Sequence, residues 1–286
     1  TTGYKLLFKN TSKYDNQAAE QINYEIISLD TSGKQVYGSM VNGVWNQAGI
    51  YNIKSLTPYE EMFNEDFNND HSIGINISSL TNIATDTHGV TLKRDSENAL
   101  YIVNEARDKA LALPTDSRLE FNDSYNYGSS SNYNKREALA VEAIKDGSTV
   151  TGFKIALKNT SKYGDNAEQV TYDILKLDVN GKQVYGSYSG SGSSMSPGAG
   201  PAAGGTWVDP NVYGAKSIAP YEKFFEDDLN DDDFIGINLN NLDAIATDTT
   251  GIRIKRDKTD KGLYLVDEST SPVTAVALQN AGWMEY

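Results

Sequence analysis

The chain has no cysteine, only two histidines and no long apolar run. Without cysteine it forms neither a disulfide bond nor a metal site built on thiolates. No stretch of 18 apolar residues occurs, so we expect no membrane-spanning helix. Histidine is the side chain best suited to acid–base chemistry at neutral pH, and two histidines leave little scope for catalysis of that kind.

Positive charge is scarce as well. The chain carries 25 Lys and Arg against 39 Asp and Glu, which gives a formal net charge of -14 and a pI near 4.6. Binding to nucleic acid or to an anionic membrane surface needs a basic face, so this balance disfavours both partners. An acidic surface is instead typical of a soluble protein, of a protein that binds divalent cations, or of both. The glycine pattern of a phosphate-binding loop is also absent from the sequence.

The residues that are abundant favour β-structure. The chain holds 18 Tyr and 24 Gly together with many Asn, Asp, Ser and Thr. Such a mixture is typical of short strands joined by many turns and leaves little room for long helices. We therefore predict a mainly β fold.

The sequence repeats itself, and its 286 residues are enough for about two domains. A duplication of this length indicates two copies of one folding unit. We predict one repeat domain at 1–121 (repeat 1), a linker at 122–135 and a second repeat domain at 136–286 (repeat 2). Each is expected to be sandwich-like, with one short helix followed by an acidic calcium-type loop. The clearest matching segments are 3–14 with 152–163, 34–39 with 182–187, and 58–60 with 220–222.

Local sequence patterns predict the positions of helices, strands and loops. Thr57 at an N-cap, Pro58 at the first helical position and glutamate in the first turn predict a short helix at 57–63, repeated at 219–225. Residues 136–144 have helix propensity, but we predict a strand because Asp146-Gly147 makes a turn before the next strand. Repeat 2 also gains a Gly/Ser/Pro/Ala-rich insert at 190–201, which predicts a surface loop.

The strand predicted at 136–144 has no counterpart before repeat 1. We interpret both ends of the chain as cuts through a larger or processed protein. An unpaired strand edge is a template for a strand of another chain. We therefore expect the missing strand before Tyr4 to come from a neighbouring subunit or from chain outside this sequence.

An acidic run follows each predicted helix, at 66–74 and 228–236. Oxygen ligands at alternate positions converge on one point in a calcium-binding loop. The alternative is a solvated turn that caps the helix and holds no ion. Further ligands are expected from Asp86 and Asp248 or from water, because two signatures of such loops are absent, a glycine at the sixth position and a glutamate at the twelfth. The predicted ligands are the side chains of Asp66, Asn68 and Asp70 with the main-chain carbonyl of Ser72 in repeat 1. In repeat 2 they are the side chains of Asp228, Asn230 and Asp232 with the main-chain carbonyl of Phe234.

Taken together, these motifs resemble the tryptophan-rich repeat domain of large secreted cyanobacterial and proteobacterial proteins, which is often found beside hemolysin-type calcium-binding repeats. The resemblance covers most of both repeats and implies an extracellular, modular and non-enzymatic protein. The motifs that carry it in repeat 2 are Lys158-Asn159-Thr160, Asp178-Val179-Asn180-Gly181, Trp207, Tyr221-Glu222-Lys223-Phe224-Phe225 and 228–236.

Comparison of the two repeats argues against an active site. Both histidines, His71 and His88, lie in repeat 1 alone and are interpreted as exposed loop residues. The carboxylate pair Glu60 and Glu61 becomes Glu222 and Lys223 in repeat 2, so a two-carboxylate glycosidase site is not preserved. We therefore predict that the protein is not an enzyme.

Two recurring sets of side chains remain open to interpretation. Arg94-Asp95 and its counterpart Arg256-Asp257 are interpreted as structural ion pairs at strand ends, with binding of an anionic ligand as the alternative. Four aromatic residues form either a sugar-stacking platform or part of the core beside the helix. These aromatic residues are Trp45 and Tyr51 in repeat 1, and Trp207 and Tyr213 in repeat 2.

The sequence thus supports two hypotheses of function. The first is a structural or adhesive module of a secreted or cell-surface bacterial protein, assembled into fibres or layers by strand sharing and stabilised by calcium. Its partners would be other copies of itself or adjoining repeats of a longer chain. The alternative is a carbohydrate-binding module of a larger extracellular, polysaccharide-active protein, with glycans as partners.

Overall fold

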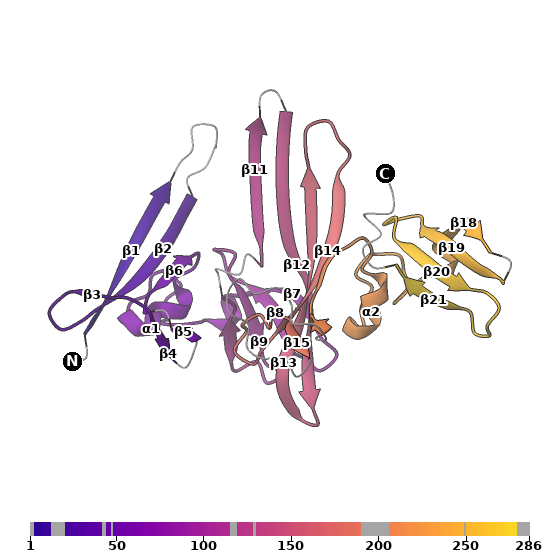
Figure 1. Ribbon diagram of the computed structural model, residues 1–286. Coiled ribbons are helices and arrows are strands. Elements are labelled where there is room, and N and C mark those ends of the chain that lie inside the picture. The colour runs from indigo at the N-terminus through magenta and orange to yellow at the C-terminus, as the bar shows by residue number, and fades with distance from the viewer. Residues whose placement is uncertain are drawn as a thin grey trace.

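The computed structural model describes residues 3–12, 21–41, 44–46, 48–114, 119–127, 130–189, 206–248 and 250–278. Antiparallel β-sheets dominate these residues, which confirms the mainly β prediction. Four larger sheets follow one another along the chain (Figure 1), and the chain also forms two small hairpins. No helix among the described residues has the length and apolar character needed to cross a membrane.

The N-terminal sheet contains the first strands of repeat 1. Its strand order is β1-β2-β3, and β6 pairs with the other part of β2. β1 pairs with β2 along its whole length, from Tyr4 opposite Leu29 to Ser12 opposite Gln21. Among the described residues no strand pairs with the outer edge of β1, so this edge is free. The strands are β1 (Tyr4–Ser12), β2 (Gln21–Leu29), β3 (Gln35–Val36) and β6 (Ile50–Ile53).

One face of the N-terminal sheet carries a small core. Ile26, Ile53 and Leu56 are buried there and pack with Leu7 and the aromatic rings that follow β6. Because side chains alternate along a strand, the neighbours of Leu7 in β1 point to the opposite face. The short helix α1 (Glu60–Phe63) lies on the covered side (Figure 1).

The middle of the molecule is a sandwich of two sheets. The short central sheet has the order β10-β9-β8-β7 and belongs to repeat 1. The long central sheet has the order β11-β12-β13-β14-β17. The strands of the short sheet are β7 (Thr81–Thr85), β8 (Thr91–Arg94), β9 (Leu100–Val103) and β10 (Ala110–Ala112). Those of the long sheet are β11 (Phe121–Tyr127), β12 (Ser130–Asp146), β13 (Thr149–Lys162), β14 (Gln169–Leu177) and β17 (Val212–Ala215).

The predicted linker differs from the structure. Residues 122–135 lie in β11 and the first part of β12, which pair as an antiparallel hairpin. β12 then continues through 136–144, which confirms the choice of a strand over a helix there. It pairs with β13 as far as Asp146 opposite Thr149. The segment between the repeats is therefore a structural part of the central sandwich.

The largest core lies between the two central sheets and crosses the boundary between the repeats. Leu92 and Ile102 from the short sheet are buried against Ile155, Leu157 and their neighbours in the long sheet. The second half of repeat 1 therefore packs against the first half of repeat 2. The other face of the long sheet packs on α2 (Ala219–Phe225) through Ala156, Ile174 and Phe225.

The C-terminal sheet has the order β18-β19-β20-β21 and lies at the opposite end of the molecule from the N-terminal sheet (Figure 1). Its core contains Leu242, Tyr264 and Val266 on one face, packed with residues that precede β18. Its strands are β18 (Leu242–Thr247), β19 (Ile252–Asp257), β20 (Leu263–Asp267) and β21 (Thr274–Ala277).

Each predicted helix site carries a short helix. A 3-10 turn at Thr57–Tyr59 leads into α1 (Glu60–Phe63), and α2 spans the matching residues of repeat 2. The cap prediction was wrong. Thr57 is inside the first turn, and the hydroxyl of Ser55 accepts the hydrogen bond from its N–H at 3.3 Å. Ser217 does the same for the N–H of Ala219 at 3.2 Å. Further 3-10 turns lie at Ile77–Ser79 and Leu239–Asn241.

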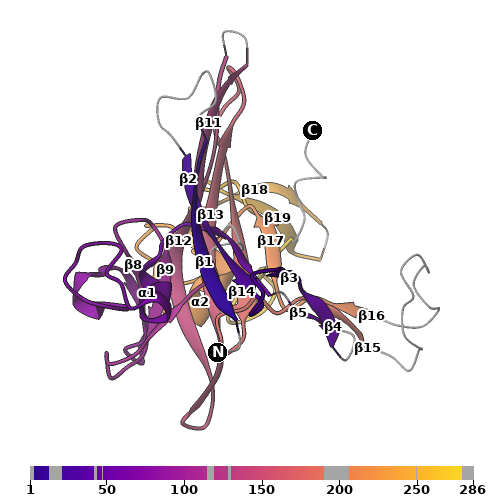
Figure 2. The same ribbon diagram turned by 90° about the vertical axis from the view of Figure 1, so that its left-hand side faces the viewer.

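Two small hairpins extend on the same side in Figure 2. The first pairs β4 (Ser39–Val41) with β5 (Val44–Asn46), and the second pairs β15 (Ser187–Ser189) with β16 (Thr206–Val208). The Gly/Ser/Pro-rich segment 190–201, predicted as a surface loop, lies outside the described residues. The backbone of Trp45 and Trp207 lies in β5 and β16.

Candidate functional site

The acidic segments form the same turn in both repeats. In repeat 1 the N–H of Asp70 donates to Oδ1 of Asn68 at 2.8 Å and to Oδ1 of Asp66 at 3.3 Å. The N–H of His71 donates to Oδ2 of Asp66 at 2.9 Å. The N–H of Ser72 in turn donates to Oδ1 of Asp70 at 2.9 Å. The structure thus gathers the predicted ligands Asp66, Asn68 and Asp70 around one short backbone segment.

Repeat 2 reproduces this pattern. The N–H of Asp232 donates to Oδ1 of Asn230 at 3.0 Å and to Oδ1 of Asp228 at 3.2 Å. The N–H of Asp233 donates to Oδ2 of Asp228, and that of Phe234 to Oδ1 of Asp232. The agreement between the repeats shows that the spacing of the side chains, rather than the residues between them, sets the turn.

The turn forms without the glycine at its sixth position. His71 and Asp233 occupy that position with φ values of 67° and 63°, in the left-handed region. Asn69 and Asp231, two residues earlier, have φ values of 57°. Asn and Asp tolerate this region better than other non-glycine residues. Both repeats therefore adopt the same positive-φ turn without glycine at this position.

A buried glutamate in the helix clamps each acidic turn. Oε1 of Glu60 accepts the N–H groups of Phe67 and Asn68, and Oε2 accepts that of Gly74 at 2.9 Å. Neither oxygen of Glu60 faces solvent, since its side chain is fully buried. The carboxylate takes up three backbone donors that would otherwise be unsatisfied.

Glu222 makes the same three contacts in repeat 2, with Leu229, Asn230 and Gly236. Burial raises the pKa of Glu222 to about 7, and the hydrogen bonds from Gly236 and Leu229 oppose the shift. From the sequence, these glutamates were predicted as first-turn residues of the helices, and Glu60 with Glu61 was considered as a catalytic pair. Their recurrence after the same Pro-Tyr motif was the signal for a structural role in both repeats.

Each turn presents a carboxylate oxygen that no described protein group satisfies. Oδ2 of Asp70 and Oδ2 of Asp232 are buried and have no hydrogen-bond partner among the described residues. Burial raises the pKa of Asp232, and the neighbouring Asp228 raises it further. Carboxylate, amide and carbonyl oxygens are the ligands that Ca²⁺ prefers, so the residues present fit this ion.

Two further buried carboxylates lie in corresponding turns of the short central and C-terminal sheets. Oε2 of Glu97 and Oδ2 of Asp260 also lack a hydrogen-bond partner among the described residues. Burial raises the pKa of Asp260 to about 6, with contributions from Asp257 and Asp232. Both residues were missed from the sequence, because four residues separate the recurring Arg-Asp and Leu-Tyr pairs at 96–99 and five separate them at 258–262.

The proposed extra ligands Asp86 and Asp248 are engaged elsewhere. Oδ1 of Asp86 accepts the N–H groups of His88 and Val90. Oδ1 of Asp248 accepts those of Thr250 and Ile252 in the same manner. Both carboxylates therefore close turns between neighbouring strands.

Asp86, His88 and Glu142 form a separate cluster at the junction of the central sheets. Their potential ligand atoms lie within 4.8 Å of one another. Nδ1 of His88 lies 3.5 Å from Oε1 of Glu142, and Oδ2 of Asp86 accepts the N–H of Ala143 at 3.2 Å. Burial raises the pKa of Glu142, and Asp86 adds to the shift. The cluster connects the turn after β7 to β12, and Thr250 replaces its histidine in repeat 2.

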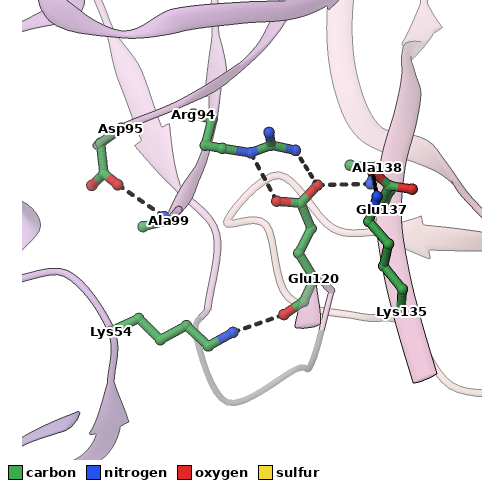
Figure 3. A network of polar contacts seen from close by, with 8 residues as sticks. All are labelled: Lys54, Arg94, Asp95, Ala99, Glu120, Lys135, Glu137 and Ala138. Atoms are coloured by element: carbon green, nitrogen blue, oxygen red, sulfur yellow. Dashed lines mark hydrogen bonds and ion pairs between the residues drawn. The ribbon is translucent and has the colours of Figure 1, made fainter. Parts of the chain in front are cut away.

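A polar network connects the same two sheets farther along (Figure 3). Arg94 binds the carboxylate of Glu120 with two hydrogen bonds, of 2.9 and 2.5 Å. Oε1 of Glu120 also accepts a hydrogen bond from the N–H of Ala138 in β12. The main-chain carbonyl oxygen of Glu120 accepts one from Nζ of Lys54. The structural interpretation of Arg94 was therefore correct, although its partner is Glu120. Asp95 instead accepts the N–H of Ala99 within its own turn.

Of the four aromatic candidates, the two tyrosine side chains lie among the described residues. Tyr51 is partly buried, whereas Tyr213 is 48% exposed and its hydroxyl accepts a hydrogen bond from Gln183. Tyr213 lines a groove with Pro220 and Tyr221. The side chains of Trp45 and Trp207 lie outside the described residues, and so does Trp283.

Comparison of the chain with protein-family models, with curated proteins and with solved structures gives no match.

Proposed function

We propose that this chain is a non-enzymatic structural module of a secreted or cell-surface bacterial protein. In this proposal the two repeats are tandem β-rich units, each with a short helix and an acidic calcium-type loop. The units assemble into fibres or layers by sharing strands with other copies of the chain or with adjoining repeats of a longer chain. The extracellular location rests on the resemblance of the repeat motifs to the tryptophan-rich repeat domain.

The observation that carries this proposal is the free edge of β1. Its counterpart in repeat 2, β13, pairs with β14 on one side and with β12 on the other. β1 pairs with β2 in the equivalent register, yet no described strand lies on its other side. A free edge offers a row of unpaired N–H and C=O groups, which a strand of another chain satisfies by β-augmentation.

The candidate chemistry supports a structural role over a catalytic one. Glu60 and Glu222, the glutamates that recur in the two helices, are fully buried and accept hydrogen bonds from backbone N–H groups. A group held in this way does not meet a substrate. Calcium, in turn, would be held by Asp66, Asn68 and Asp70 and by the matching residues of repeat 2. It would add charge compensation to turns that already have the required path.

A peptide with the sequence of residues 136–146 tests the strand-sharing step. This segment of β12 pairs with β13 in the structure, so the homologous edge of β1 should accept it. We expect saturable binding, a higher melting temperature and slower hydrogen exchange of backbone amides in residues 4–12. Exchange in residues 149–162 should not change, because β12 already covers that edge.

Two peptides with single proline substitutions, Val141→Pro and Glu142→Pro, serve as controls. Adjacent N–H groups of a strand point in opposite directions, so one of the two prolines must remove a ladder hydrogen bond. At least one should bind several-fold more weakly than the parent peptide. Equal binding of a scrambled peptide, or no binding of the parent, would contradict strand sharing at β1.

A further inference from the structure

The two terminal sheets each leave one apolar face uncovered. In the N-terminal sheet the side chains that alternate with Leu7 are exposed, and Leu6 is 41% exposed. In the C-terminal sheet Leu265 is 39% exposed, although its neighbours Tyr264 and Val266 are fully buried on the other face. Among the described residues no sheet covers either face. The uncovered residues are Tyr4, Leu6 and Phe8 in the first sheet, and Ile245, Ile252, Ile254, Leu265 and Val276 in the second.

The central sandwich shows what covers such faces. The long central sheet contains the repeat 2 counterparts of β1 and β2, and the short central sheet contains the repeat 1 counterparts of β19 and β20. These two sheets pack face to face and form the largest core of the molecule. The chain therefore contains one complete interface between a sheet of each type. The N-terminal sheet corresponds to one side of this interface, and the C-terminal sheet corresponds to the other side.

The counterparts of the exposed C-terminal residues are buried in that interface. Ile102, the counterpart of Leu265, is 2% exposed, and Leu92, the counterpart of Ile254, is fully buried. The bulge in β7 between Asn82 and Ala84 also recurs in β18, so the register of the two sheets is the same. The remaining pairs are Val90 with Ile252, Ile83 with Ile245, and Leu111 with Val276.

The N-terminal face has the same relation to the long central sheet. Ile155, the counterpart of Leu6, is fully buried against the short sheet. Phe153 and Leu157, the counterparts of Tyr4 and Phe8, belong to the same core. Apolar side chains are thus retained at these three equivalent positions, although no described sheet covers them in repeat 1.

A turn at the edge of the interface supports the comparison. A Cβ at Gly181, after β14, would lie 2.8 Å from Leu113 and 3.4 Å from Leu111 of the short sheet. The counterpart Gly33, after β2, has the same left-handed backbone with φ of 83° and no described atom within 4 Å of such a Cβ. Among the described residues, the space beside Gly33 that corresponds to the place of the short sheet beside Gly181 is therefore open.

We infer that the open face of the C-terminal sheet of one molecule packs on the open face of the N-terminal sheet of a second copy. The contact repeats the packing of the central sheets and rests on the proposed assembly function. It joins two different surfaces, so each copy of a bound pair keeps one open face, and the pair presents one open face of each kind. Such a head-to-tail contact generates an open chain of molecules unless the rotation between them closes a ring.

The free edge of β1 lies beside this contact. In the central sandwich β12 pairs with β13 and also passes close to β7 and β8. A donor strand beside β1 would therefore rest against β18 and β19 of the second copy. Face packing and strand sharing support each other, but they use different groups and can be tested separately.

Two single substitutions test the face contact. Leu6→Lys places a charge on the N-terminal face, and Leu265→Lys places one on the C-terminal face. Each residue is more than a third exposed, so the isolated fold should tolerate the change. The expected result is that wild-type protein forms concentration-dependent oligomers, whereas each variant alone sediments as a monomer. A 1:1 mixture of the two variants should form heterodimers and nothing larger, because each variant keeps one intact face.

The possible outcomes separate the two proposals. Tyr185→Glu, which changes an aromatic residue that is 72% exposed and lies on neither face, should assemble like wild type. Oligomers of unchanged size in both lysine variants would overturn the face contact and leave strand sharing at β1 standing. Self-association of one variant alone would show that two identical faces meet, which also contradicts the inference. A wild-type chain that stays monomeric at all concentrations would overturn the face contact, whereas strand sharing at β1 is decided by the experiment with the 136–146 peptide.

Discussion

Burial of the carboxylates of Glu60 and Glu222 costs free energy, because a charged group loses its hydration. Each is fully buried, and each is held by three backbone N–H groups from the turn that follows its helix. Hydrogen bonds to a charged acceptor are about twice as strong as those between neutral groups, which offsets part of the loss of hydration. The same turns hold non-glycine residues at positive φ, as at His71. These glutamates therefore fix a backbone path that the local sequence alone would not favour.

The unsatisfied oxygens of Asp70 and Asp232 lead to the prediction on calcium. Adding calcium to chelator-treated protein should raise the melting temperature, because an ion bound only by the folded state stabilises it. At about 100 times its Kd the ion would contribute about 2.7 kcal/mol. Asp70→Asn and Asp232→Asn should each remove part of this increase, and the double variant should remove nearly all of it. Differential scanning fluorimetry with and without chelator measures the effect.

Asp231→Asn is the matched control for this prediction. Asp231 is an exposed carboxylate in the same turn, and repeat 1 already has Asn69 at this position with the same φ of 57°. The substitution removes one negative charge without removing a predicted ligand. The Asp231→Asn variant should keep the calcium-dependent increase in melting temperature. No shift in the wild-type protein would identify the acidic segments as solvated turns.

At the scale of single elements, alternation and turn residues predicted much of the fold. The strand at 136–144 was separable from a helix because Asp146-Gly147 forms the turn between β12 and β13. The helix at 57–63 was also located, although its N-cap is Leu56 rather than Thr57, and the hydroxyl of Ser55 accepts the N–H of Thr57. This contact depends on how the chain enters the helix, which the order of residues does not reveal.

The pairing of sheets could not be predicted from the sequence. Leu92 and Ile254 occupy equivalent positions with similar side chains, yet one is fully buried and the other is 36% exposed. The difference depends on whether another sheet is near in space, and no local pattern reports that. The clamp formed by Glu60 was missed for the same reason, since its partners lie seven to fourteen residues away. The acidic ligand set, by contrast, was visible because its contacts span only a few residues.

Equivalent positions in the two repeats should therefore differ in their contribution to stability. Ile155→Ala opens a cavity in the central core and should lower the free energy of unfolding by about 3 kcal/mol. Leu6→Ala, at the exposed counterpart, should lower it by about 1 kcal/mol or less in dilute solution. Urea unfolding followed by circular dichroism measures both. Equal losses in the monomer would mean that the N-terminal face is already covered within one molecule.

At the scale of the whole molecule, the net charge of -14 opposes contact between two copies of the chain. The faces proposed to meet are apolar, so salt should act mainly by screening this repulsion. The Debye length falls from about 30 Å at 0.01 M salt to about 8 Å at 0.15 M. We therefore expect head-to-tail association to strengthen several-fold over that range at constant calcium concentration, as measured by analytical ultracentrifugation. Leu6→Lys should stay monomeric at both salt concentrations. An association that weakens as salt is added would show that ion pairs, rather than the open faces of the terminal sheets, hold the copies together.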